Sequence, residues 1–573
     1  DRGGTVEVLL TRIVQSPCRL IGLSAVLGEA DKLAKWMRAD VVKYERRPVE
    51  LRYGVLHAGT FRYRTYNEYS EGEETLVDVP GESPWETLTQ NVCQFAEAGE
   101  SCLVFVKAKH EARRGAELRA RRYAGPAASN ALAALADLED TCARETLLVS
   151  LESGIAFHST DLTPDERRIV EEAFRAGEIR VLVSTSTLAV GLNLPARNVF
   201  ITAEKWCYDR RFGMPWKAPI LRGEYESMGG RAGRYGAGHE YGRSILIAAT
   251  PFDQETLWRR YIEGAREPIE PRLAKEPLEN YVLRLVASRF CTKEDELIEF
   301  LESTPSGEWV WHELYTPEEV GVRVRAAVNR AMDAGALAPA EDGRVEATPF
   351  GQAIASKGIA LGTARELERW ICDSETRVWC DVDLLLAAAL TPDGRMYNVS
   401  LTAKEYDTGD YPRRLRAVEC DEISADVPLK RLRNSTVTPF FEEVRAIKIA
   451  LFLKDWIEHA SLRELEEEHH TMTGQVLSAS EQIAWIVDAA AGIAQARGCA
   501  DGFVKRLRML SERVQRGLRA EAVPLARLGE PGISRGALAA LVTACLHTPR
   551  ALAYNPSVVL GRLYVSLELV DHV

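Results

Sequence analysis

The chain has 573 residues, of which 46% are hydrophobic, so it is long enough for several packed domains. Its formal net charge of −12 excludes a uniformly basic surface, and any contact with nucleic-acid phosphates must use local basic groups. Eleven scattered cysteines without a Cys-x-x-Cys pair argue against a disulfide framework and against a metal site. Without a leader or an apolar run of roughly 18 residues, we expect a soluble, cytoplasmic protein that contacts no membrane.

The N-terminal part of the sequence alternates between helical and strand-like patterns. Residues 6–13 have the pattern of a helix, and the strand-like residues 20–23 and the segment 24–26 follow. From about residue 60 to residue 250, short apolar runs alternate with amphipathic helices, as in an open parallel α/β sheet. The expected strands are 102–106, 179–183, 199–201 and 244–247, and a helix capped by Thr163 is expected between the first two.

Helical patterns dominate the second half of the chain. An apolar stripe over 278–286, a helix capped at Thr316 and an Asp342-Gly343 turn follow the order of a winged-helix module. An unspecialised helical domain with a surface hairpin has the same order, so the pattern leaves both open. The remaining predicted segments are long helices over 360–500, interrupted by a loop near 391–412, and short helices over 501–573 joined by a turn at 529–532.

Two arginines in a glycine-rich segment give the strongest chemical signal. The segment 225–236 contains Gly-Gly-Arg-Ala-Gly-Arg, in which Arg231 and Arg234 are three residues apart, so we expect them to share one helical face. Paired guanidinium groups suit the γ-phosphate of a nucleotide, because phosphoryl transfer spreads negative charge over three oxygens. The alternative is a glycine-rich turn that carries two solvated arginines.

A run of hydroxyl residues follows one of the predicted strands. Ser184, Thr185 and Thr187 can donate hydrogen bonds to phosphates, and ligands bind at the strand ends of open α/β sheets. Gly191 and Asn193 allow a close backbone approach and a polar contact. A plain connection between two strands would tolerate the same residues, and the run alone does not decide between these interpretations.

Three motifs together resemble those of superfamily-two helicases. Segments 154–168, 185–196 and 230–234 are similar, in order and spacing, to motifs IVa, V and VI of the Ski-two-like branch. Residues 24–26 resemble motif III, and residues 102–106 resemble motif IV. Within the branch, the sequence most resembles the archaeal and bacterial fork-repair DNA helicases related to the helicase part of DNA polymerase theta.

The resemblance implies both a fold and an activity. The implied activity is ATP-dependent translocation on single-stranded DNA that unwinds duplex or forked DNA in repair, replication-fork processing or genome defence. The alternatives are an RNA helicase of the same branch and a non-hydrolysing nucleic-acid-binding subunit of a repair or defence complex. The implied α/β plus all-α fold has a remnant of a first RecA-like motor domain at 1–45, a second RecA-like motor domain at 46–265, a winged helix at 266–352, a helical ratchet domain at 353–500 and a helix-hairpin-helix domain at 501–573.

Two motifs of the helicase ATP site do not occur in the sequence. The 573 residues contain neither a Gly-x-x-x-x-Gly-Lys-Ser/Thr loop nor an Asp-Glu-x-His box, which would hold the phosphates and magnesium. We therefore expect this chain alone to be inactive as an ATPase. ATP and Mg²⁺ should bind only with a phosphate-binding lobe that belongs to a longer protein or to a separate chain.

The resemblance also implies roles for individual residues. An aromatic side chain at Trp485 would stack on a base, and aromatic residues of a hairpin would separate the strands, although a core tryptophan and a surface loop remain alternatives. The implied residues are Arg231 and Arg234 at the γ-phosphate, Ser24, Gly191, Asn193 and Ser227 in ATP binding or coupling, His158, Ser159, Thr185, Thr187 and Trp485 at nucleic acid, and Trp206, Tyr208, Phe212 and Trp216 in the hairpin.

Three positions depart from the pattern of the helicase family. Ser227 replaces the usual Gln of motif VI, Val26 replaces the Thr of motif III, and Ser478 or Leu477 replaces the Arg that accompanies the ratchet tryptophan. These residues couple ATP hydrolysis to strand movement in the family, so the sequence leaves open a weakened or specialised motor.

Overall fold

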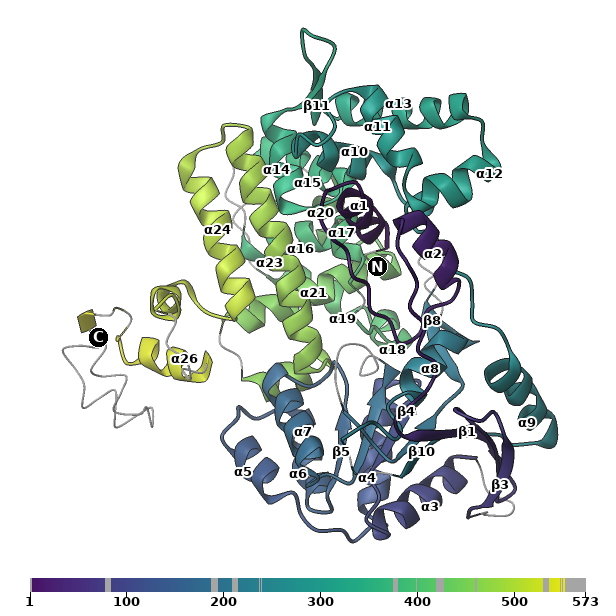
Figure 1. Ribbon diagram of the computed structural model, residues 1–573. Coiled ribbons are helices and arrows are strands. Elements are labelled where there is room, and N and C mark those ends of the chain that lie inside the picture. Colours follow the sequence, from purple (N-terminus) through teal and green to yellow (C-terminus); the bar gives the residue numbers. More distant parts are fainter. Residues whose placement is uncertain are drawn as a thin grey trace. The chain divides into compact units, whose positions relative to one another are not determined.

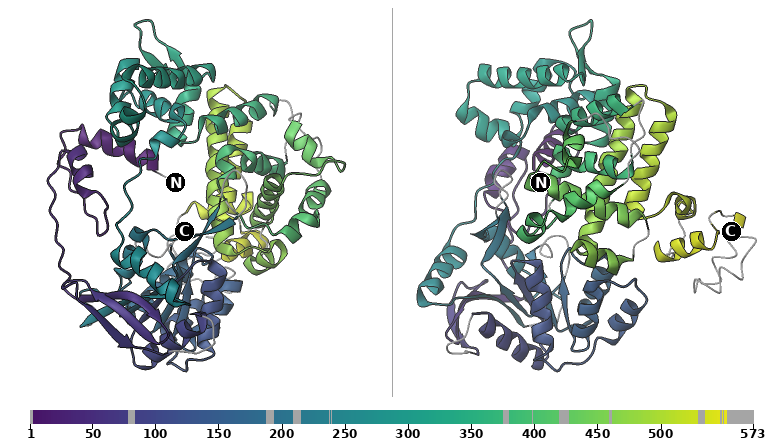
Figure 2. Two further views of the ribbon diagram at one scale, coloured as in Figure 1. Left: turned by 90° about the vertical axis from the view of Figure 1, so that its right-hand side faces the viewer. Right: turned by 180° about the vertical axis from the view of Figure 1, so that it is seen from behind.

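The chain forms two compact units in the computed structural model, one of residues 19–270 and one of residues 1–18 with 271–573 (Figures 1 and 2). The segment 1–45, predicted as a motor-domain remnant, is therefore divided between the units. The structure describes residues 3–77, 84–186, 194–208, 215–236, 238, 240–374, 380–397, 399–418, 427–458, 461–528, 535–546, 548, 550 and 551.

A mostly parallel sheet forms the centre of the unit 19–270 (Figure 1). Among the described residues it has eight strands in the order β3-β2-β1-β10-β7-β4-β6-β5. The strands from β1 to β5 in this order are parallel, and β2 and β3 extend the β1 edge in antiparallel pairing. Their bounds are β1 Glu50–His57, β2 Thr60–Thr65, β3 Glu71–Thr75, β4 Cys102–Val106, β5 Ile155–His158, β6 Val181–Thr185, β7 Asn198–Ile201 and β10 Tyr241–Ile247.

The burial of the central strands explains why their sequences are continuous apolar runs. Every residue of β4, β5, β6 and β7 is buried, as expected for parallel strands that are covered on both faces. The predicted strands 102–106, 179–183, 199–201 and 244–247 correspond to β4, β6, β7 and β10, which confirms the parallel-sheet prediction. The strand expected at residues 20–23 was wrong, because these described residues form no strand and expose Ile21 and Leu23.

Helices flank this sheet, and a small separate hairpin follows β7. Helix α7 begins as predicted, because the Thr163 side chain accepts a hydrogen bond from the Glu166 amide and Pro164 occupies the first helical position. The helices of the unit 19–270, of which α2 is not one of those that flank the sheet, are α2 Ala30–Met37, α3 Pro84–Glu97, α4 Lys109–Ala120, α5 Ser129–Ala136, α6 Cys142–Leu151, α7 Pro164–Ala176, α8 Arg222–Gly229, α9 Pro251–Leu257 and the π-helical η2 Trp258–Glu263, and the hairpin consists of β8 Glu204–Tyr208 and β9 Pro215–Pro219.

In its described residues, the other unit is helical except for one short hairpin. Its first part has the predicted order of helices and hairpin, with the Thr316 cap and a turn in which Gly343 has φ +76°. These elements are α1 Gly3–Val14, η3 Leu273–Lys275, α10 Leu278–Ala287, α11 Glu294–Glu302, η4 Gly307–Trp311, α12 His312–Leu314, α13 Pro317–Asp333, β11 Leu337–Pro339, β12 Val345–Ala347 and α14 Pro349–Lys357.

Long helices form the rest of this unit, and α23 and α24 lie side by side (Figures 1 and 2). The loop expected near 391–412 contains short helices instead, because Thr391 and Thr402 cap new helix starts. The turn expected at 529–532 lies outside the described residues. The elements are α15 Leu361–Ser374, α16 Asp381–Leu390, α17 Pro392–Arg395, α18 Ala403–Asp407, α19 Asp410–Ala417, α20 Val427–Arg433, α21 Phe441–Ile457, α22 Leu462–His469, α23 Thr473–Ala496, α24 Asp501–Arg516, η5 Ala520–Ala522, α25 Val523–Ala526 and α26 Arg535–Thr543.

A buried carboxylate attaches α1 to the helical unit. Glu7 accepts hydrogen bonds from the amides of Arg272, Leu273 and Ser306 and, at 2.7 Å, from the Ser306 hydroxyl. These four donors compensate the cost of burying the charge. Among the described residues of the whole chain, no helix combines the length and the apolar character needed to cross a membrane.

Candidate functional site

The glycine-rich segment with the two arginines forms a turn after α8, not a continuation of the helix. Helix α8 ends at Gly229, and the expectation that Arg231 and Arg234 share a helical face was therefore wrong. The turn is bound to the sheet by its backbone: the Ala196 amide donates to the Arg231 carbonyl at 3.2 Å, and the Gly233 amide donates to the Ala196 carbonyl at 3.0 Å. Backbone contacts thus place both arginines at the amino-terminal edge of β7.

Glycine is required in this turn for two physical reasons. Gly233 has φ +60°, a conformation that side chains with a Cβ rarely adopt. A Cβ at this position would also lie 2.6 Å from the Gly242 nitrogen at the start of β10, and a Cβ on Gly242 would lie 2.2 Å from the Gly233 nitrogen. The two backbones can approach only because both residues are glycine.

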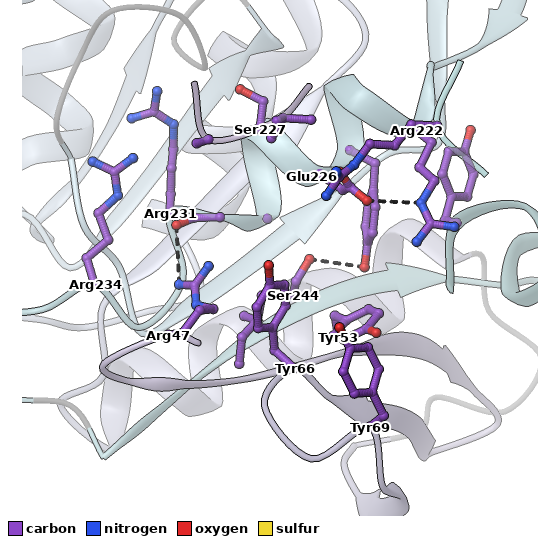
Figure 3. A pocket seen from close by; sticks show the side chains of 18 residues that line it. Arg47, Tyr53, Tyr66, Tyr69, Arg222, Glu226, Ser227, Arg231, Arg234 and Ser244 are labelled. Carbon is purple, nitrogen blue, oxygen red and sulfur yellow. Dashed lines mark hydrogen bonds and ion pairs between the residues drawn. The ribbon is translucent and has the colours of Figure 1, made fainter. Parts of the chain in front are cut away.

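Arg47, which the sequence analysis did not identify, holds the same turn from the other side. Its Nη2 donates to the Ala232 carbonyl at 2.7 Å and lies 3.5 Å from the Gly230 carbonyl. Asn67 fixes the backbone of Arg47 through two hydrogen bonds, of 2.8 and 3.1 Å. Figure 3 shows Arg231 and Arg234 extending in the same direction, with Arg47 beneath them. No local pattern marks Arg47, because its partners lie more than 180 residues away in the sequence.

These three arginines line a cavity of about 560 Å³ in the unit 19–270 (Figure 3). Ala25, Val26 and Ser227 also line it, so the structure brings the predicted motif III segment and Ser227 to the arginine turn. Ser24 itself is exposed, and its hydroxyl donates to the Val26 carbonyl. The remaining lining residues that Figure 3 labels are Tyr53, Tyr66, Tyr69, Arg222, Glu226 and Ser244.

The electrostatics of the cavity favour an anion. Among the described lining residues, five are arginines and one, Glu226, is a carboxylate that pairs with Arg222 at 3.0 Å and with Arg266 at 2.5 Å. Burial, and then the charge of Arg234, lower the pKa of Arg231 to about 10. The guanidinium therefore stays protonated near pH 7, and a bound phosphate would relieve the repulsion between the two cations.

The predicted nucleic-acid residues of motifs IVa and V lie at the opposite, carboxyl-terminal edge of the sheet. His158 and Thr185 are the last residues of β5 and β6, and His158 pairs with Ser184 in the register of the two strands. The side chains of His158, Ser159 and Thr185 are buried, and His158 Nε2 lies 3.0 Å from a Glu171 carboxylate oxygen. Thr187, Gly191 and Asn193 lie outside the described residues.

The predicted strand-separating segment begins as the hairpin of β8 and β9. Trp206 is partly buried beneath the Lys217 ammonium group, which lies 5.6 Å from the ring centroid, and Trp216 is exposed. Tyr208 ends β8, and nothing is described of its side chain. Phe212 lies outside the described residues. The backbone at the base of the hairpin therefore agrees with the predicted hairpin. Of the four predicted aromatic side chains, the structure describes those of Trp206 and Trp216.

Trp485 lies on α23 in the helical unit, as predicted. Its indole nitrogen donates to the Lys357 carbonyl at 2.7 Å, and its ring packs partly against the core of that unit. The side chain is neither fully buried nor fully exposed. This position satisfies the polar N–H group and leaves part of the ring accessible.

One group of potential metal ligands is present among the described residues. Ligand atoms of Asp455, Glu468 and His469 lie within 4.8 Å of one another. The Arg414 guanidinium already pairs with Glu468 at 2.8 Å and with Asp455 at 3.5 Å. A cation is thus already bound by these groups, and they give no support for a metal site.

Comparisons with known proteins agree with the motifs. Residues 85–236 match the family described as helicase conserved C-terminal domain, and residues 382–517 match archaeal helicase, domain 4. The chain is similar to the ATP-dependent DNA helicase Hel308 of Pyrococcus horikoshii, with 30% identity over 95% of this chain and 71% of the relative. For the same-named proteins of Pyrobaculum calidifontis and Caldivirga maquilingensis, the identities are 30% and 27%, over 91% and 92% of this chain and 70% and 68% of the relatives.

Proposed function

Because the chain belongs to the Hel308 family, in the Ski-two-like branch of superfamily-two helicases, we propose that it is the arginine-bearing part of an ATP-driven DNA helicase. The observation that carries this proposal is the cavity lined by Arg47, Arg231 and Arg234, of which Arg231 and Arg234 lie in the segment 85–236 that matches the helicase conserved C-terminal domain. We propose that the γ-phosphate of ATP binds to Arg231 and Arg234, which stabilise the charge that develops during its transfer. Ser227 and residues 24–26 would couple this event to the rest of the protein.

The proposed ATP site needs a second lobe. The 573 residues contain no Gly-x-x-x-x-Gly-Lys-Ser/Thr sequence, and the one carboxylate among the described lining residues is engaged by two arginines. We propose that the phosphate-binding loop and the Mg²⁺ ligands come from a lobe that carries motifs I and II, and that this chain alone does not hydrolyse ATP. When bound, Mg²⁺ would neutralise phosphate charge, while the arginines of this chain orient the γ-phosphate.

We propose single-stranded and forked DNA as the substrate, with a role in repair or fork processing. The similarity to proteins named as DNA helicases supports DNA over RNA. The half-buried ring of Trp485, held by its N–H group, is suited to stacking on a base during translocation. The hairpin of β8 and β9, with Trp206 and Trp216, would separate the strands.

The described elements also support a domain assignment. Helices α10, α11 and α13 and the β11–β12 hairpin support a winged helix within 266–352. Helix α23 supports a ratchet domain, and we propose that this domain includes α24, because the Ser511 hydroxyl of α24 donates to the Ala484 carbonyl of α23 at 2.7 Å. The proposed helix-hairpin-helix would then begin after Gly517. We also propose a reducing compartment such as the cytoplasm, because the eleven cysteines are scattered and form no Cys-x-x-Cys pair.

Removing one arginine tests this proposal. With the phosphate-binding lobe present, in the same protein or as a separate chain, Arg234→Ala should lower DNA-stimulated ATP turnover by about 10³-fold and leave the affinity for single-stranded DNA nearly unchanged. Arg259→Ala, which removes an exposed arginine of the same unit, is the control and should turn over normally. Undiminished turnover in Arg234→Ala would exclude the proposed ATP site.

A further inference from the structure

Helix α8 connects the two edges of the sheet. The hairpin of β8 and β9 follows the carboxyl-terminal end of β7, and its base is closed where the Ile220 amide donates to the Ala203 carbonyl at 3.0 Å. Helix α8 begins two residues later and ends immediately before the arginine turn at the amino-terminal edge. Its eight residues cover roughly 12 Å along the helix axis. One short helix thus separates the proposed strand-separating hairpin from the arginines.

The hydroxyl of Tyr261 holds the base of this hairpin. It lies 2.9 Å from the Ile220 carbonyl and 3.3 Å from the Ala203 carbonyl. It can therefore donate a hydrogen bond to the backbone on either side of the hairpin base. The Tyr261 side chain is almost completely buried, and burial raises its pKa to about 12. The hydroxyl therefore remains a donor throughout the physiological pH range.

The ring of Tyr261 contacts α8 at the same time. The ring centroids of Tyr261 and Tyr225 lie 5.3 Å apart, and the Tyr225 hydroxyl accepts a hydrogen bond from Ser244 on β10. Both rings also border the cavity that contains the arginines. A single side chain therefore touches the hairpin base, the middle of α8 and the wall of the cavity.

Tyr261 is itself anchored to the sheet, through a π-helical turn. In η2, the Trp258 indole nitrogen donates to Glu263 at 3.1 Å, and the Arg62 guanidinium of β2 lies 3.8 Å from the Trp258 ring centroid. π-helical turns within helices are rare and often occur at functional sites. The turn makes Tyr261 a fixed point on the sheet, against which the hairpin base is held.

We propose that Tyr261 is a positioning residue that transfers the nucleotide-driven movement of this unit to the hairpin. This inference rests on the proposed functions of the arginine cavity and of the hairpin. When ATP draws the arginine turn toward the phosphates, the sheet moves with the turn, and the hydroxyl makes the hairpin base move with the sheet. Without the hydroxyl, the resisting duplex displaces the hairpin, and ATP is hydrolysed with less strand separation.

The substitution Tyr261→Phe tests the inference, because it keeps the ring and removes the hydroxyl. In protein that has both motor lobes, the number of base pairs separated per ATP hydrolysed should fall about ten-fold, the factor expected when one buried hydrogen bond is lost from the coupled state. Tyr123→Phe is the matched control: it removes a buried hydroxyl of the same unit that donates to the Ala96 carbonyl, away from the hairpin and from the arginine cavity. Its ratio should stay within about two-fold of the unsubstituted protein.

A second variant addresses the same connection at another point. Lys205 of β8 lies 2.7 Å from both carboxylate oxygens of Glu224 on α8, in a partly exposed ion pair. Lys205→Met should lower the same ratio by about two-fold, as expected for a pair that is screened by solvent. Melting temperatures of all three variants would separate coupling from stability, since the two phenylalanine variants should melt alike.

Two results would overturn the inference. One is a ratio of base pairs per ATP in Tyr261→Phe that equals the ratio in Tyr123→Phe, and the other is a normal ratio in Tyr261→Phe. Arg234→Ala distinguishes this failure from a failure of the proposed function. If Arg234→Ala abolishes ATP turnover while Tyr261→Phe remains fully coupled, the cavity assignment stands and the role of Tyr261 is excluded.

Discussion

Arg47 gives a direct test of how the arginine turn is held in place. Its guanidinium donates to the Ala232 carbonyl at 2.7 Å, between the positions of Arg231 and Arg234 in the turn. Arg47→Met keeps the length and the apolar stem of the side chain and removes every donor and the charge. We expect the turn to lose its fixed position and ATP turnover to fall, while Arg231 and Arg234, which we propose to bind phosphate, remain.

The size of the effect follows from the hydrogen bonds. A hydrogen bond from a charged group contributes about 1.5–3 kcal/mol, and the second contact, at 3.5 Å to the Gly230 carbonyl, is too long to add much. If this energy is lost only from the transition state, kcat falls roughly 10- to 150-fold, at about 1.4 kcal/mol for each factor of ten. The KM for ATP should change less, because Arg231 and Arg234, the proposed phosphate ligands, keep their charges.

The assay is steady-state ATP turnover with saturating single-stranded DNA, in protein that has both lobes. Arg46→Met is the matched control, because Arg46 is the exposed neighbour of Arg47 in the chain. Arg47→Lys should recover part of the activity, since an ammonium group can still donate to one carbonyl. Equal kcat values for Arg47→Met and Arg46→Met would refute the positioning role, and so would a change confined to KM.

Two further predictions concern the backbone of the turn and a buried histidine. Gly233→Ala should lower ATP turnover at least about ten-fold, because its Cβ would meet the backbone of Gly242, whereas Gly236→Ala has the same positive-φ cost of about 1–2 kcal/mol without a clash and should stay active. Burial lowers the pKa of His158, against the opposing hydrogen bond to Glu171, so the folded state loses stability as pH falls below the unfolded pKa of about 6.5. Between pH 7.5 and 5.5, the free energy of unfolding measured in urea should fall less for His158→Gln than for the unsubstituted protein. The slopes of the two free energies against pH should differ by at most about 1.4 kcal/mol per pH unit, and equal slopes would contradict this reasoning.

The central strands could be predicted from the sequence, and the edge strands could not. Strands β4, β6 and β7 are buried on both faces, so their apolar runs stand out from the surrounding sequence. Strands β2 and β3 are half-exposed and antiparallel, and the ion pairs of Arg62 and Arg64 with Glu71 give them the composition of a loop. The strand expected at residues 20–23 failed for the opposite reason, because apolar residues alone do not provide a partner strand.

The sequence could indicate the arginine pair because Arg231 and Arg234 are three residues apart, whereas it did not reveal the residues that contact this turn from distant parts of the chain. Arg47 contacts carbonyls that belong to a glycine-rich turn far along the chain, and a carbonyl partner leaves no residue type to recognise. The hydroxyl of Tyr261 also binds to carbonyls, at Ala203 and Ile220. Contacts of a side chain with a distant backbone carbonyl are therefore the part of this site that is hardest to predict from the sequence.

The two arginines lie in a turn and not on a shared helical face, and this difference has a mechanical consequence. If α8 had continued through Arg231 and Arg234, their positions would depend on the packing of one helix, which can shift against the sheet. Instead, the backbone of the turn bonds to Ala196 before β7, and Gly233 lies against Gly242 of β10. A force on the guanidinium groups is thus passed directly to two central strands. The glycines of the turn therefore do more than allow a sharp bend, because they make the arginines move with the sheet.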